Sequence, residues 1–142
     1  MRAAILLIGS AVSIAPAWGA ERVSLRSLVA EPRSYLEKLI RLPTMGCVDN
    51  PKGGFICVEP VGGQMLRIDA SALGAATGLR IAERLIGDCK GTANLSSPVC
   101  RVEVEITPRS THRDMLETSA GSRPIVVVYS GQIDMFDVKA RR

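Results

Sequence analysis

The sequence predicts a mostly β fold, and three observations support this prediction. Segments with strand patterning outnumber helical ones, in the order strand, strand, strand, helix, strand, strand. A short helix is expected before the first strand. Four cysteines form two pairs of similar spacing, Cys47 with Cys57 and Cys89 with Cys100, which predicts two bracing disulfides. Five strands with one helix between the third and the fourth is the order of an OB-like barrel.

The first two elements are a short helix and a long strand. Residues 24–30 place apolar side chains at helical spacing, and Pro32 ends the helix. Residues 36–48 then alternate with period two, which predicts the first barrel strand. Pro43 within it favours an edge position or a bulge, and Gly46 favours a sharp coil in the strand or a close approach of another backbone.

The next two strands are separated by turns and followed by a helix. Turn-forming residues fill 49–54 and 60–63, so residues 55–59 and 64–70 are expected to form the second and third strands. Apolar residues at helical spacing in 79–86 then predict the helix that precedes the fourth strand.

The C-terminal half is predicted to contribute two more strands. A loop is expected at residues 88–98, and residues 100–106 alternate so regularly that they predict a half-buried strand. Residues 108–122 are polar and predicted to be irregular. The last strand is expected to start at residue 125 and to run toward Met135, with Tyr129 among the core valines.

Residues 1–20 have the layout of a secretory signal peptide that is removed from the mature protein. Arg2 gives a positive start, a short apolar run follows, and small residues lead to a cleavage site within residues 17–21. The mature protein is then one domain, residues 21–136, with a charged, disordered tail at 137–142. No later segment approaches the ~20 apolar residues of a membrane helix, so no integral membrane segment is expected after processing.

The start of the mature chain resembles that of small bacterial secreted or periplasmic OB-fold proteins. The matching residues are Leu28, Pro32, Tyr35, Lys38, Ile40 and Leu42. In such proteins a short helix leads through a tyrosine into the first barrel strand. The chain departs from the usual pattern because it lacks a glycine before Lys38. The resemblance implies a fold and a periplasmic or secreted location, and it transfers no active site.

The cysteines are interpreted as structural. Cys47 and Cys57 lie symmetrically about a turn near Lys52, so strand pairing would place them opposite each other. Cys89 and Cys100 bracket the loop between the helix and the fourth strand. A structural zinc site is the alternative, but such sites usually draw ligands from closer cysteine pairs. The sequence therefore predicts two disulfides in an oxidising compartment, with no metal site and no cofactor.

The candidate catalytic residue is His112, the only histidine of the chain. A hydrolase could use it with an acidic partner such as Asp114. However, residues 109–114 contain no nucleophile elbow, and the segment is predicted to be a polar loop. A solvated loop histidine is therefore the favoured interpretation. No other group of residues forms a convincing catalytic constellation, so the protein is predicted to be non-catalytic.

A binding surface is expected on the charged faces of two strands. The candidate residues are Arg67, Asp69, Arg101, Glu103 and Glu105. The leading hypothesis is an exported binding module for an unknown protein or small ligand in the cell envelope. The alternative of single-stranded nucleic-acid or polyanion binding would use arginines. The formal net charge of +4 and the few aromatic residues argue against a nucleic-acid partner.

Overall fold

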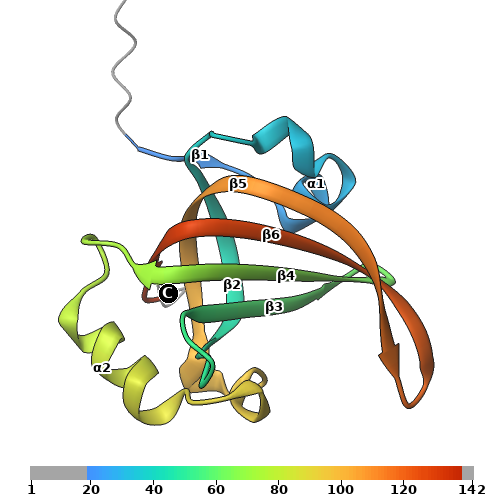
Figure 1. The fold of residues 1–142 in the computed structure, drawn as a ribbon. Coiled ribbons are helices and arrows are strands. Elements are labelled where there is room, and N and C mark those ends of the chain that lie inside the picture. Colours follow the sequence, from blue (N-terminus) through green and yellow to red (C-terminus); the bar gives the residue numbers. More distant parts are fainter. Residues whose placement is uncertain (1–18, 139–142) are drawn as a thin grey trace, which may run out of the picture.

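The computed structural model describes residues 19–138. Most of the predicted signal peptide and the last four residues of the predicted tail lie outside this range. Within it, five strands close into a barrel in the order β2-β3-β4-β6-β5, and β5 pairs back onto β2 (Figure 1). One extra strand, β1, pairs with β2. The predicted mostly β barrel with two helices and two disulfides is confirmed.

The elements follow the predicted order along the chain. The strands are β1 (Glu21–Arg22), β2 (Ile40–Asp49), β3 (Phe55–Val61), β4 (Gln64–Leu73), β5 (Arg101–Thr118) and β6 (Gly121–Phe136). The helices are α1 (Leu25–Ala30) and α2 (Leu79–Asp88), with short 3-10 helices η1 (Pro32–Tyr35), η2 (Thr92–Asn94) and η3 (Pro98–Cys100). The two α-helices lie on opposite sides of the barrel (Figure 1). In the described residues, no helix has both the length and the apolar character to cross a membrane.

The barrel core is built from alternate residues of each strand. In β4 the inward side chains Leu66 and Ile68 are fully buried, while the side chains between them are partly exposed. In β5 the predicted alternation is confirmed, because Val102, Val104 and Ile106 are all buried. Burying a side chain of this size contributes about 1.5–3 kcal/mol, so the alternation fixes which face of each strand turns inward.

Strand β2 changes its inward face part-way along. Leu42 is buried, but a register shift against β5 separates it from Met45, which is also buried. This register shift is a β-bulge, and beyond it Cys47 faces the core. Simple alternation from the buried Leu42 would have placed Cys47 on the outer face of the strand. Pro43 lies within the shift, because a residue without an N–H fits where the ladder is interrupted.

Both predicted disulfides are present. Cys47 and Cys57 occupy directly opposed positions of β2 and β3 and are bonded to each other. Cys89 and Cys100 join the end of α2 to the start of β5. All four side chains are fully buried. The first bond therefore fixes the register of the β2–β3 hairpin, and the second closes the loop between α2 and β5. All four cysteines are paired.

The prediction that residues 108–122 are irregular is wrong. β5 continues through this segment to Thr118, and β6 begins at Gly121, so the two strands form one long hairpin. The hairpin projects beyond the barrel (Figure 1). His112 accordingly lies on a strand and not in a polar loop. The end of the segment, residues 115–118, shows no alternation in the sequence because neither face of the strand is covered there.

Candidate binding face

The register of four strands places a row of side chains on one outer surface of the barrel. Val58 of β3 is opposite Arg67 of β4, Arg67 is opposite Val127 of β6, and Val127 is opposite His112 of β5. Paired residues point to the same side of a sheet, so all four project away from the core. We call this surface of β3, β4, β6 and β5 the outer face.

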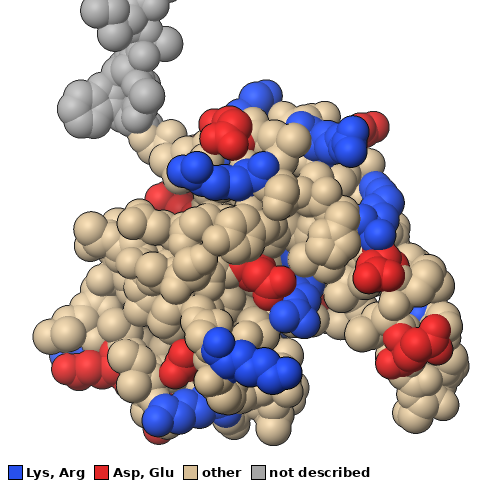
Figure 2. Space-filling model, in the orientation of Figure 1, with Lys and Arg blue, Asp and Glu red and all other residues tan. Residues whose placement is uncertain are grey.

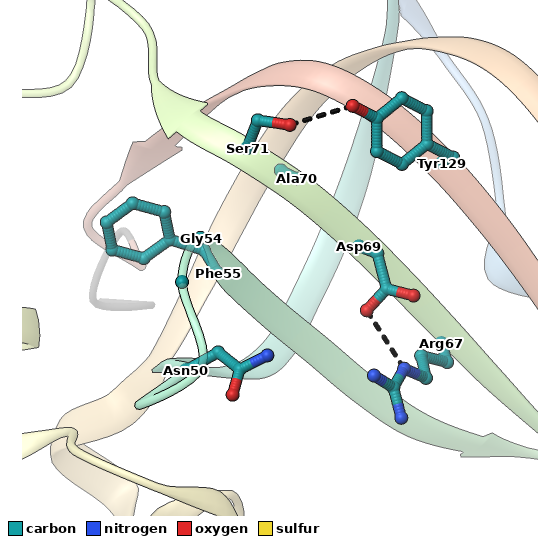
Figure 3. A pocket seen from close by; sticks show the side chains of 9 residues that line it. Asn50, Gly54, Phe55, Arg67, Asp69, Ala70, Ser71 and Tyr129 are labelled. Carbon is teal, nitrogen blue, oxygen red and sulfur yellow. Dashed lines mark hydrogen bonds and ion pairs between the residues drawn. The ribbon is translucent and has the colours of Figure 1, made fainter.

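A hollow of about 480 Å³ lies on the outer face beside the β2–β3 turn. Its lining residues come from that turn, from three strands and from nowhere else, and they are Asn50, Gly53, Gly54, Phe55, Arg67, Asp69, Ala70, Ser71 and Tyr129. Figure 3 shows Arg67, Asp69 and Ser71 along β4, with the Tyr129 ring reaching over from β6. The parallel pairing of β4 with β6 brings these distant parts of the chain together.

Two short interactions organise the polar groups of the hollow. Arg67 Nε donates to Asp69 Oδ1 at 2.9 Å, and both side chains are about one-third exposed, at 39% and 34%. The hydroxyl oxygens of Ser71 and Tyr129 lie 2.7 Å apart in a hydrogen bond (Figure 3). These contacts hold the side chains in place while leaving each of them accessible to a ligand.

Tyr129 does not lie among the core valines as expected. It is 41% exposed, because Val126 and Val128 face inward and the odd-numbered position 129 faces out. The sequence of consecutive β-branched residues in β6 does not show which of the two faces is buried. The parallel register with β4, which sets Tyr129 opposite Asp69, settles the choice.

The turn at one end of the hollow requires glycine at position 54. Gly54 has a φ of +75°, a left-handed conformation, and a Cβ there would collide with the carbonyl oxygen of Ala70. The Asn50 N–H donates to the Gly54 carbonyl at 2.9 Å, and the Asn50 side-chain oxygen accepts from Lys52 N at 3.2 Å. The turn is therefore a tightly bonded rim for the hollow.

The other predicted surface residues lie on a different part of the barrel wall. Arg101 donates to Glu59 Oε1 at 2.9 Å. Glu103 and Glu105 both pair with Arg41, at 3.0 and 3.4 Å, and the Arg41 guanidinium lies 4.2 Å from the centre of the Phe136 ring. The structure thus divides the five predicted residues into two groups, Arg67 with Asp69 in the hollow and the remaining three on β5 near β2.

The arrangement suits binding better than acid–base chemistry. Arg67 and Asp69 neutralise each other, so the hollow offers hydrogen-bond donors and acceptors with little net charge. Positive and negative groups also alternate over the side of the molecule shown in Figure 2. In the described part of the chain, no group of three or more His, Cys, Asp or Glu residues is placed to hold a metal ion.

His112 lies on the outer face, exposed to solvent. Within residues 19–138 its ring has no hydrogen bond to a carboxylate, the contact that would orient a catalytic histidine. Its neighbour Asp114 instead accepts from the backbone N–H of Met115 at 2.8 Å.

Sequence reasoning identified Arg67 and Asp69 but missed Asn50, Phe55, Ser71 and Tyr129. The turn-forming composition of residues 49–54 is the only signal that pointed toward part of this group. Phe55 and Tyr129 are among the few aromatic residues of the chain. Phe55 is set opposite Ala70 by the β3–β4 hairpin, whereas Tyr129 is set opposite Asp69 by a parallel pairing of residues 60 positions apart.

Comparison with known proteins gives little further information. No protein-family model matches the chain, and no curated protein matches it. A crystal structure from Leishmania major Friedlin, described as that of "a putative aspartyl-tRNA synthetase", is similar at 11% sequence identity and a TM-score of 0.43. The match covers 92% of this chain and 23% of that one, so the chain spans less than a quarter of its length. Similarity at this level supports no conclusion about function.

Proposed function

We propose that this protein is an exported, non-catalytic OB-type module that binds its ligand on the outer face, in the hollow between the β2–β3 turn and Tyr129. The ligand is a protein segment or a small molecule of the cell envelope. The strand order supports the OB assignment, because the barrel strands follow one another as first, second, third, fifth and fourth, with α2 between the third and the fourth.

The location of the hollow is the observation that carries this proposal. OB barrels commonly bind ligands on the face of their second and third strands, next to the loop that joins the first two. In this chain those strands are β3 and β4, and the loop is the turn at residues 50–54. The hollow lies at this position, with Arg67, Asp69 and the Tyr129 ring accessible in it.

Export is proposed from two independent features. The leader of residues 1–20 has the composition of a signal peptide. The two buried disulfides fit an oxidising compartment, since such bonds are rare in proteins of the reducing cytoplasm. Detection of the mature chain, beginning within residues 17–21, in an envelope or medium fraction would test this part. Unprocessed chain with reduced thiols in the cytoplasm would contradict it.

Site-specific photocrosslinking tests the binding face. Tyr129→p-benzoylphenylalanine places a photoreactive group in the hollow, and Leu79→p-benzoylphenylalanine places the same group on α2, where Leu79 is exposed and outside the hollow. Irradiation in the native envelope is expected to give a discrete adduct, read as a mass gain, from position 129 only. Combining it with Arg67→Ala and Asp69→Ala should remove the adduct. Equal yields from both positions, or none from 129, would contradict the proposal.

The two alternative functions gain no support from the described residues. The hydrolase hypothesis needs His112 to be oriented by a carboxylate, and its ring is exposed without such a contact. The polyanion hypothesis would use unpaired arginines, and four of the arginines in residues 19–138, Arg41, Arg67, Arg84 and Arg101, are instead paired with a carboxylate.

A further inference from the structure

Two hollows adjoin each other where the N-terminal helices pack against the barrel. The first, of about 480 Å³, separates residues 111–113 of β5 from residues 30–33. The second, of about 440 Å³, lies between α1 and the β3–β4 turn at residues 61–64. Ala30 lines both hollows, and we call the two together the cleft. The cleft shares no lining residue with the hollow beside Tyr129, so an inference about it is independent of the proposed function.

The guanidinium of Arg113 lies where the two hollows meet. Its Nη2 donates to the carbonyl oxygens of Val29 and Ala30, at 2.8 and 3.4 Å, and its Nη1 donates to Gln64 Oε1 at 3.4 Å. The two carbonyls end α1, so Arg113 caps this helix and is held in place by it. All three acceptors are neutral. Because a guanidinium has five N–H donors, two of them remain for another partner.

The cleft has a small excess of positive charge. Arg33 lines the first hollow and Arg26 lines the second, and both side chains are exposed. Within residues 19–138, no ion pair joins Arg26, Arg33 or Arg113 to a carboxylate. Glu31 is the one acidic residue that lines either hollow. Three arginines and one glutamate thus surround the cleft, and an anion bound there would offset their mutual repulsion.

We propose that the cleft binds a small organic anion, whose phosphate or carboxylate group is held by Arg113 and Arg33. Guanidinium N–H groups form charge-assisted hydrogen bonds with either kind of oxyanion. The rest of the ligand occupies the second hollow, where Gly62 and Gly63 of the turn contribute no side chains. Arg113 is already fixed by its contacts with α1, so binding costs little of its conformational freedom.

The number of arginines fits a small ligand better than an anionic polymer. The affinity for a polyanion falls with salt according to the number of charges that the protein neutralises, and it rests on many such contacts. The cleft offers only three arginines, one of which is partly occupied by the end of α1. A small molecule needs no more than these, because one acidic group can accept from two guanidinium groups at once.

Titration of the mature, oxidised protein, followed by amide NMR shifts at low ionic strength, tests the site. The probes are phenyl phosphate, benzoate and phenol, which share an aromatic ring and differ in the acidic group. At least one of the two anions should give saturable shifts at the amides of residues 30–33 and 111–113, and phenol should give none. The anion that binds more tightly identifies the acidic group that the cleft prefers. Absence of saturable shifts with both anions, or equal shifts with phenol, would overturn the proposal.

Two matched variants test the role of the arginines. Arg33→Gln should weaken binding of the preferred anion at least fivefold, while Arg80→Gln, the same change at an exposed position of α2 outside the cleft, should leave the affinity unchanged. Arg113→Gln should abolish binding, but it also uncaps α1. The Arg33 variant therefore decides, because its side chain makes no hydrogen bond or ion pair within residues 19–138 and its loss leaves the fold intact. Equal affinities of the Arg33 and Arg80 variants would overturn the assignment.

Discussion

At the scale of single residues, two glycines show how differently the same residue type can be used. A Cβ on Gly46 of β2 would collide with the carbonyl oxygen of Leu95, a backbone atom that cannot rotate away. A Cβ on Gly87 of α2 would have nothing within 4 Å. Gly46 therefore permits the loop at residues 89–100 to pack on the barrel, which is one of the two roles predicted from its place in a strand, whereas Gly87 performs no such function.

The same substitution should consequently have opposite effects at the two positions. Gly46→Ala should lower the free energy of unfolding by about 1–3 kcal/mol, because the loop must move away from β2. Gly87→Ala should raise it by about 0.5 kcal/mol, since alanine restricts the unfolded chain and favours the helix. Urea unfolding with both disulfides intact measures both changes, and a loss of stability in the Gly87 variant would contradict this account.

Asp134 anchors the connection between β4 and α2. Its Oδ1 accepts hydrogen bonds from the N–H groups of Ala76 and Thr77, at 2.9 and 3.1 Å. The Thr77 hydroxyl in turn accepts from the N–H of Met135 at 3.0 Å. Gly74 passes so close that a Cβ there would collide with the Asp134 carboxylate. One β6 side chain thus holds a segment that has no regular structure of its own.

Removing this carboxylate should loosen the connection. Asp134→Ala is expected to cost about 1–3 kcal/mol, because two backbone donors lose their acceptor. Asp134→Asn, which keeps an oxygen in the same place, should cost less. Hydrogen exchange should become faster at the Ala76 and Thr77 amides in the alanine variant. The exchange rates of the buried β4 amides should rise only as much as the loss in the global free energy of unfolding requires. Unaltered exchange at these two amides would show that the contact contributes nothing.

At the scale of elements, prediction from the sequence succeeded where one face of a strand is buried. The alternation in β4 and in the first half of β5 reports the barrel interior directly. It failed for the end of the β5–β6 hairpin, residues 115–124, because a ribbon exposed on both faces has no reason to alternate. It also missed β1, whose two residues are too few to give a pattern, and the change of face in β2, where the bulge interrupts the period.

The candidate site was predictable only in part, for a related physical reason. Arg67 and Asp69 could be identified as outward-facing from local alternation alone. Their neighbours Ser71 and Tyr129 meet through the parallel pairing of β4 with β6, which no local pattern encodes. The disulfide between Cys47 and Cys57 could be predicted because both cysteines belong to one hairpin, in which their positions relative to the turn set the strand register.

The loop between α2 and β5 should depend on its disulfide. Replacing Cys89 and Cys100 together by alanine is expected to lower the free energy of unfolding by about 2–3 kcal/mol, from the entropy of closing a loop of this length in the unfolded chain. Thermal or urea denaturation of the purified double variant measures the loss. The matched variant with Cys47 and Cys57 replaced should lose a similar amount, because that loop is nearly as long. Denaturation midpoints unchanged from the native protein would refute the estimate.

At the scale of the whole molecule, the positive charge is distributed rather than concentrated. The formal net charge is +4, and carboxylates lie next to many of the arginines, as Figure 2 shows for one side. We expect the mature protein to elute from a sulfated-polysaccharide column below about 0.15 M salt, since weak, screened attraction is all that such a surface provides. Retention well above that salt concentration would favour the polyanion hypothesis instead.

The position of β6 in the chain has a consequence for how the protein is made. It is the last strand in the sequence, yet it joins β4 to β5 and thereby closes the barrel. Until β6 has emerged from the ribosome, β2, β3 and β4 can form only an open sheet with its apolar side uncovered. The barrel can therefore close only once β6 is free to pair, and until then the apolar side of the incomplete sheet can associate with other chains.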